Sequence, residues 1–123
     1  MCERTDLQFL QDILESILAA SDFVQGYDFN RFTQDRKTKS ATIRELEVIG
    51  EASSRISTEK KELYQSVPWR LLKDFRNVLS HEYFGVNDQI VWDIVLNKLP
   101  PLKSQIEKII SIELKIVSSG TDR

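Results

Sequence analysis

The sequence predicts an all-α protein, an up-and-down bundle of four to five helices that forms a single domain. Apolar residues recur at helical spacing along most of the 123-residue chain, and the connections between the periodic segments are short. Only four glycines and three prolines are present, too few for the many turns of an all-β sandwich. The length also fits one compact domain rather than two.

The first helix is expected to begin near Thr5, because Thr5-Asp6-Leu7-Gln8 has the form of a capping box. A core-facing stripe follows at helical spacing and consists of Leu7, Leu10, Ile13, Leu14, Ile17, Leu18 and Val24. Gly26 is suited to ending this helix. Residues 28–33 are expected to form a connector or a single turn.

The second helix should extend from Asp35 to Ile56. Its inward face is predicted to carry Ile43, Leu46, Ile49, Ala52 and Ile56, while Arg44, Glu45, Glu47 and Arg55 point mostly outward. Residues 57–65 are charged and are expected to form a short connector with one loose turn.

Pro68 suits the first turn of a third helix, since a proline there removes no internal hydrogen bond. The apolar face of that helix is formed by Leu72, Phe75 and Leu79, with Gly85 as a natural stop. Asn87 can cap a fourth helix through Trp92 and Leu96, and Pro100 and Pro101 then break the pattern or start the next helix. The last helix is predicted to bury one broad stripe of Leu102, Ile106, Ile109, Ile110, Ile116 and Val117, with Ile112 and Leu114 off it. The helical domain is therefore expected over residues 1–117, followed by a fraying tail over 118–123.

Charge and cysteine content narrow the class of protein. The formal net charge of −2 argues against a protein that coats nucleic acid through its overall field, but it allows a local basic site. The single Cys2 can form no internal disulfide, so a reducing compartment is expected. No signal-peptide pattern and no apolar run of membrane-spanning length occurs. We therefore expect a cytoplasmic protein without a membrane partner.

Candidate chemistry is concentrated in residues 75–84, around the only histidine of the chain, His81. An imidazole can take up and release a proton near neutral pH. Arg76 is permanently cationic and presents a planar fork that matches phosphate oxygens. Together these groups suffice in principle for cleavage of RNA without a metal. The alternative is that His81 is a solvated or capping residue and Arg76 an ordinary surface cation.

Helical geometry constrains this pair. At about 100° per residue, Arg76, Ser80 and Tyr83 share one face of the third helix, whereas His81 lies roughly 140° from Arg76. Either the helix distorts near Ser80, or the site needs groups from a second chain. Both alternatives are compatible with a site at a symmetric interface.

The pattern Arg76-Asn77-x3-His81-x-Tyr83 resembles the Arg-x4-His-x-Tyr signature of the HEPN superfamily, in particular its HepT-like toxins. The flanking sequence is also similar to that family: Pro68-Trp69-Arg70 before the motif, Tyr83-Phe84-Gly85 after it, then Val91-Trp92, Leu99-Pro100-x-Leu102, and the segment Ile49-Gly50-Glu51-Ala52. The resemblance covers residues 5–114.

This resemblance implies a homodimeric helical bundle in which paired Arg/His motifs line a cleft between protomers. It implies a metal-independent endoribonuclease toxin of a HepT/MntA (type VII) toxin–antitoxin system, with no cofactor. The partner would be a minimal nucleotidyltransferase antitoxin that attaches AMP to the motif tyrosine. Carried over by position, Arg76 and His81 are catalytic, Asn77 and Ser80 are supporting, and Tyr83 is the modified residue. Arg70 and Lys73 are expected to contact RNA together with Arg76.

Other features have plainer interpretations. Trp69 and Trp92 are expected as core or interface anchors rather than as base-stacking platforms. Glu45, Glu47 and Glu51 could suggest a carboxylate metal site, but no histidine lies in that helix, and we expect a solvated face with one inward glutamate and no metal. The run Arg36-Lys37-x-Lys39 is a second candidate for phosphate contact. The alternative function is a non-catalytic helical subunit that binds and regulates a nucleotidyltransferase.

Overall fold

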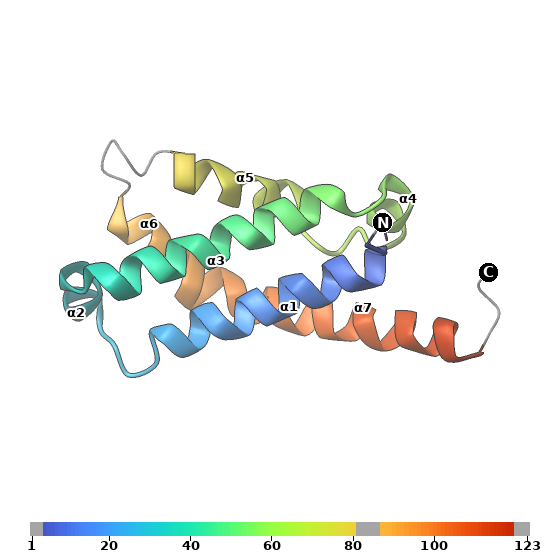
Figure 1. Cartoon of the computed structure of the whole chain (residues 1–123), viewed down its shortest axis with the longest axis horizontal. Helices are drawn as coiled ribbons and strands as arrows, with labels where there is room; N and C mark the ends of the chain where they lie inside the picture. The colour runs from blue at the N-terminus through green and yellow to red at the C-terminus, as the bar shows by residue number, and fades with distance from the viewer. Residues whose placement is uncertain (1–3, 81–86, 120–123) are drawn as a thin grey trace.

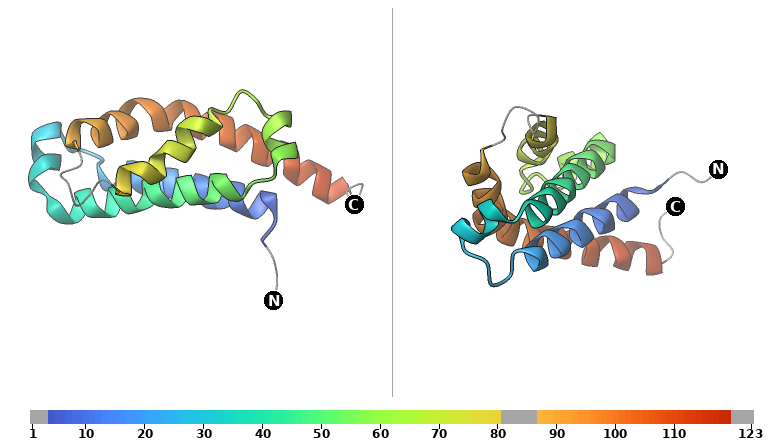
Figure 2. Two further views of the ribbon diagram at one scale, coloured as in Figure 1. Left: turned by 90° about the horizontal axis from the view of Figure 1, so that it is seen from above. Right: turned by 60° about the vertical axis from the view of Figure 1, so that its left-hand side comes forward.

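The computed structural model describes residues 4–80 and 87–119, and this part of the chain is all-helical with no strand, which confirms the expected fold class. Four long helices form the bundle: α1 (Asp6–Phe23), α3 (Arg36–Arg55), α5 (Trp69–Ser80) and α7 (Leu99–Ser119). They alternate in direction along the long axis of the molecule (Figure 1). Helix α3 packs between α1 and α5, and α7 packs on α1 (Figures 1 and 2).

Short helices connect the long ones at the two ends of the bundle. Helix α2 (Phe29–Gln34) contacts α6 (Asp88–Asp93) at one end, and α4 (Thr58–Leu63) lies at the other (Figure 1). At the first end the Trp92 ring packs against Phe29 and Phe32, with ring centroids 6.3 and 5.0 Å apart. The two segments expected as connectors form the helices α2 and α4. Each helix is a little longer than the single turn expected from the sequence.

Helix α1 begins as predicted. The Thr5 side chain accepts a hydrogen bond from the Gln8 N–H, and the Gln8 side chain accepts one from the Thr5 N–H. Beyond the helix, Gly26 has φ +81°, a conformation that favours glycine. The expectation for Leu18 is wrong, because this side chain is 46% exposed. The buried line follows residues 10, 13, 17, 20 and 24, and Leu18 lies about 100° around the helix from Ile17.

Helix α3 confirms its predicted bounds and inward face. Asp35 is its N-cap and Ile56 its C-cap. All five residues expected to point inward are buried: Ile43, Leu46, Ile49, Ala52 and Ile56. This helix is central to the bundle, since α1 covers one of its sides and α5 another.

The helical backbone is continuous from Asp88 to Ser119. Between α6 and α7 lies the π-helical segment η2 (Ile94–Lys98), where the Leu99 N–H donates to the Ile94 carbonyl five residues earlier. Pro100 and Pro101 lie in the first turn of α7. A proline has no backbone N–H to donate, and its ring crowds the carbonyl four residues earlier. Because a π-helical turn is wider than an α-helical one, η2 accommodates both prolines without a break in the helix. Of the two alternatives for these prolines, the start of a helix is the correct one.

Helix α7 buries Leu102, Ile106, Ile109 and Ile110 as predicted. The expectation for Val117 is wrong, since this side chain is 52% exposed. The last turns of α7 extend past the start of α1 (Figures 1 and 2), so they have little to pack against in the described part of the chain. Residues 118 and 119 continue the helix, and the rest of the expected tail lies outside the described residues.

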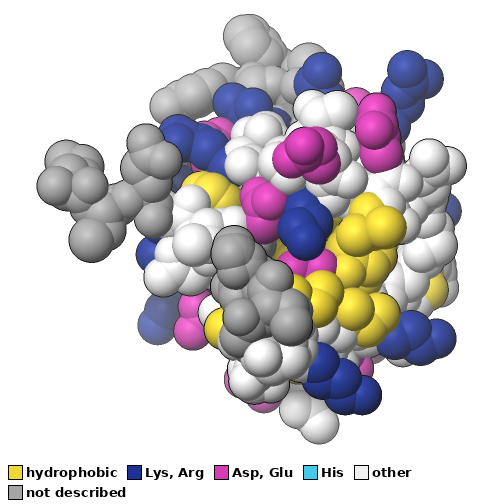
Figure 3. Space-filling model, turned by 90° about the vertical axis from the view of Figure 1, so that its right-hand side faces the viewer, with side chains coloured by type: hydrophobic (Ala, Val, Ile, Leu, Met, Phe, Trp, Pro, Cys, Tyr) yellow, Lys and Arg dark blue, Asp and Glu magenta, His cyan; other side chains and the backbone are white. Residues whose placement is uncertain are grey.

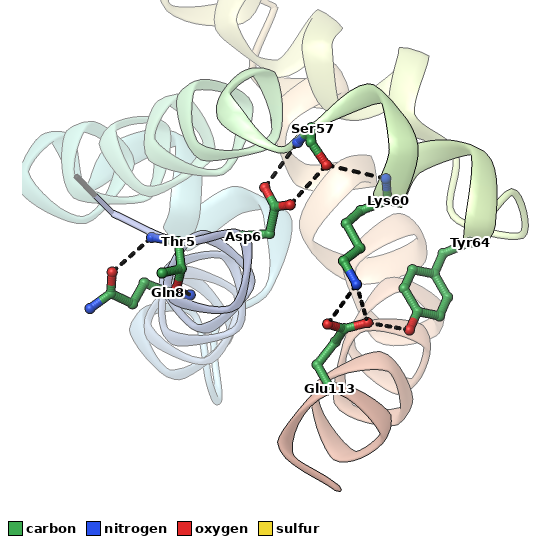
Figure 4. A network of polar contacts seen from close by, with 7 residues as sticks. All are labelled: Thr5, Asp6, Gln8, Ser57, Lys60, Tyr64 and Glu113. Carbon is green, nitrogen blue, oxygen red and sulfur yellow. Dashed lines mark hydrogen bonds and ion pairs between the residues drawn. The ribbon is translucent and has the colours of Figure 1, made fainter. Parts of the chain in front are cut away.

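A polar network joins α7 to α4 and α4 to α1 (Figure 4). The buried Glu113 accepts hydrogen bonds from Lys60, 3.1 Å from Nζ to Oε2, and from the Tyr64 hydroxyl. Burial, followed by the hydrogen bond to Glu113, raises the pKa of Tyr64 to about 12. Asp6 accepts from the N–H and hydroxyl of Ser57, at 2.9 and 2.8 Å. These contacts hold α1, α4 and α7 together at this end of the molecule. Apolar side chains also reach the surface there, between charged ones (Figure 3).

In the part of the chain that the structure describes, every helix is too short or too polar to span a bilayer.

Candidate functional site

Arg76 lies near the C-terminal end of α5, on the side of that helix that faces α3. Leu72 and Phe75 are buried in the core and hold α5 in place. The Arg76 side chain is 48% exposed, so its guanidinium remains accessible to a ligand. The backbone is α-helical through Ser80, so the distortion considered from the sequence does not occur before that residue.

Gly50 on α3 lies directly beneath Arg76. A Cβ atom at position 50 would lie 2.4 Å from Arg76 Cγ, 2.9 Å from the Arg76 backbone nitrogen and 3.0 Å from the Leu72 carbonyl oxygen. The first two separations are shorter than real Cβ contacts and the third is unusually tight, and two of the three involve backbone atoms that cannot rotate away. A glycine inside a helix costs about 1 kcal/mol relative to alanine. The close approach of α5 to α3 explains why glycine is needed here.

Glu51 joins the two helices beside this contact. Its Oε1 lies 3.3 Å from Arg76 Nη2, and its Oε2 accepts a hydrogen bond from Arg55 Nε at 3.1 Å. One carboxylate thus contacts two guanidinium groups, one on its own helix and one on α5. The three side chains carry a formal charge of +1, which leaves the cluster attractive to an anion.

Of the other predicted site residues, the structure describes some fully, some by their backbone alone and some not at all. Arg70 and Lys73 are exposed on α5, the helix that carries Arg76, as contact with a phosphate chain would require. Asn77 and Ser80 belong to the same helix, but their side chains lie outside the described residues. His81 and Tyr83 also lie outside the described residues, so their roles stay predictions.

Within the second phosphate-contact candidate, Arg36 and Lys37 are exposed, whereas Lys39 is engaged within the fold. Lys39 Nζ lies 3.1 Å from Asp88 Oδ2 and donates to the Thr33 carbonyl oxygen at 3.2 Å, which ties α3 to α6.

Trp92 is buried, and half-buried Trp69 donates from Nε1 to the Tyr64 carbonyl oxygen at 3.1 Å, so both act as anchors. No group of three or more His, Cys, Asp or Glu side chains suited to a metal ion occurs among residues 4–80 and 87–119.

Sequence reasoning missed Gly50 and Glu51 as parts of the site. From the sequence, Glu51 is expected to be one of three glutamates on a mostly solvated face. An isolated glycine within a helical pattern was the available signal, because it indicates either a kink or a close approach of another backbone. Which helix approaches, and at which residue, depends on how α3 and α5 pack.

Comparisons with known proteins show which family the chain belongs to. The family model described as HepT-like, "Ribonuclease HepT-like", matches residues 13–109, well over half of the chain. A provisionally named RNase of Methanocaldococcus jannaschii is 45% identical over 102 residues, which cover 83% of this chain and 84% of the relative. A probable ribonuclease HepT of Thermococcus cleftensis is 39% identical over 107 residues, covering 87% of this chain and 97% of the relative. No solved structure gives a significant match. The chain therefore belongs to the HepT-like ribonuclease family.

Proposed function

We propose that this protein is a metal-independent endoribonuclease toxin, acting as a homodimer and controlled by a minimal nucleotidyltransferase antitoxin. The observation that carries the proposal is the half-exposed Arg76 guanidinium on α5, the helix that also presents exposed Arg70 and Lys73. Family membership supports a ribonuclease. The toxin role and the partner rest on the resemblance of the Arg76–Tyr83 motif to HepT-like toxins.

In the proposed reaction, the 2′-oxygen of the RNA attacks the neighbouring phosphorus and the bond to the 5′-oxygen breaks. His81 takes the proton from the 2′-hydroxyl or gives one to the leaving 5′-oxygen. Arg76 stabilises the charge that develops on the phosphoryl oxygens. The products are a 2′,3′-cyclic phosphate and a 5′-hydroxyl. Asn77 and Ser80 support this pair, and Arg70 and Lys73 bind phosphates along the strand.

RNA cleavage by the purified chain, measured with and without a chelator, tests this proposal. We expect the wild type to cut RNA equally in both conditions. Arg76→Ala and His81→Ala should each lose about a hundredfold or more in rate, with unchanged helical circular dichroism. Arg44→Ala is the matched control, because Arg44 is an exposed arginine paired with Glu47 on α3, and it should cut like the wild type.

Cleavage that persists in His81→Ala, or that stops when the chelator is added, would contradict the mechanism. A chain that cuts no RNA but still binds a nucleotidyltransferase would instead support the alternative of a non-catalytic regulatory subunit.

A further inference from the structure

We infer that Glu51 is a positioning residue that holds the Arg76 guanidinium in the orientation needed for RNA cleavage, an inference that rests on the proposed function. Glu51 contacts Arg76 across the α3–α5 interface, 3.3 Å from Oε1 to Nη2. Its role differs from that of Arg76, because the carboxylate is acidic and has no attraction for a phosphate.

The first support is the geometry of the carboxylate itself. Oε2 accepts from Arg55 Nε at 3.1 Å while Oε1 faces Arg76, so each carboxylate oxygen has a guanidinium partner. Arg55 is four residues after Glu51 on the same helix, which fixes the carboxylate relative to α3. The oxygen that faces Arg76 therefore has a defined place.

The second support is the contact beneath it. Gly50, the residue before Glu51, lets the backbone of α5 approach α3 so closely that even a Cβ would collide with Arg76 and Leu72. The base of the Arg76 side chain therefore lies close to the Gly50 backbone, and Glu51 contacts the opposite end of the same side chain. A long side chain held at both ends loses the rotamer freedom that would otherwise be lost on binding RNA.

The obvious alternative is an ordinary surface ion pair. Both side chains are nearly half exposed, 48% for Arg76 and 45% for Glu51, and pairs of this kind add little to stability. Removing the Glu51 charge should therefore leave the fold almost unaffected, which makes its effect on cleavage a clean measure of positioning.

The test compares Glu51→Gln with wild type and with Glu47→Gln, a matched control that removes the partner of Arg44 on the same helix. Glu51→Gln should lower kcat for RNA cleavage by about tenfold to a hundredfold through misplacement of the guanidinium. KM should stay the same or fall, because one negative charge beside the phosphate site is removed. Glu47→Gln should match the wild type in both constants, and all three proteins should melt at similar temperatures.

A double-mutant cycle with Arg76→Ala tests whether Glu51 acts through Arg76. In the Arg76→Ala background, Glu51→Gln should cause no further loss of cleavage. Equal losses in both backgrounds, or a Glu51→Gln protein with wild-type kcat, would overturn the inference.

A measurement without RNA separates this inference from the proposed function. Rotation about the Nε–Cζ bond of Arg76, followed by nuclear magnetic resonance, should be slower in wild type than in Glu51→Gln. Slower rotation in a wild-type protein that cuts no RNA would support the positioning contact and refute the ribonuclease proposal. Equal rotation in the two proteins would refute the contact itself.

Discussion

At the scale of single residues, the candidate site combines one arginine that the structure places with one histidine and one tyrosine that follow it in the sequence. Arg76 is anchored by Gly50 and Glu51, both on α3. Tyr83 is seven residues after Arg76 and two after His81. We expect its hydroxyl to lie close to the scissile phosphate, where an added AMP would oppose RNA binding by charge repulsion and by bulk.

Tyr83→Phe should therefore keep its fold and escape inactivation by a cognate nucleotidyltransferase. Wild type and Tyr83→Phe are incubated with that enzyme and ATP, weighed by intact mass spectrometry and assayed for RNA cleavage. Tyr64→Phe is the control, because the Tyr64 hydroxyl is bonded to Glu113 within the fold. An adenylyl mass increment that persists in Tyr83→Phe, or one that leaves cleavage unchanged, would show that Tyr83 is not the control point.

At the scale of helices, side-chain caps mark where several elements begin, α3 among them. Asp35 caps α3, where its carboxylate accepts from the Tyr27 hydroxyl at 2.6 Å, from the Thr38 N–H at 3.0 Å and from the Thr38 hydroxyl at 2.9 Å. These bonds, that from Tyr27 first, lower the pKa of Asp35 from 3.8 to about 2. Because the folded state binds this proton more weakly than the unfolded state, the stabilisation is present above about 3.8 and is lost as the pH falls towards 2.

Tyr27→Phe should reduce this acid sensitivity. The variant removes the hydroxyl but keeps the ring that lies 3.9 Å from the Arg31 guanidinium. The free energy of unfolding, measured by urea denaturation from neutral pH down to about 2, should fall less steeply in Tyr27→Phe than in wild type. An identical slope for Tyr27→Phe would show that this hydroxyl does not set the pKa of Asp35.

At the scale of the whole molecule, the polar network around Glu113 and the candidate site lie on different elements. The Glu113 network joins α4 to α7, whereas Arg76 lies on α5 beside the C-terminal half of α3. A single arginine and histidine on one regular helix would point in different directions. We therefore expect the site to be completed by a second copy of the chain.

The protein should accordingly be a dimer at micromolar concentration, as measured by light scattering. RNA cleavage per chain should fall on dilution, in step with the appearance of monomer. A stable monomer that retains full cleavage would contradict the composite site. Arg76→Ala should remain dimeric, which separates loss of chemistry from loss of assembly.

The sequence by itself determined the bundle, the capping box at Thr5, the bounds of α3 and the Arg76–Tyr83 motif. These features depend on local spacing and local hydrogen bonds, which a single helix expresses alone. The exposure of Leu18 and Val117 and the pairing of Glu51 with Arg76 were decided by the tertiary structure. Each depends on which helix lies opposite and how far it extends. Periodicity places a side chain on a face of its own helix, whereas packing determines what that face contacts.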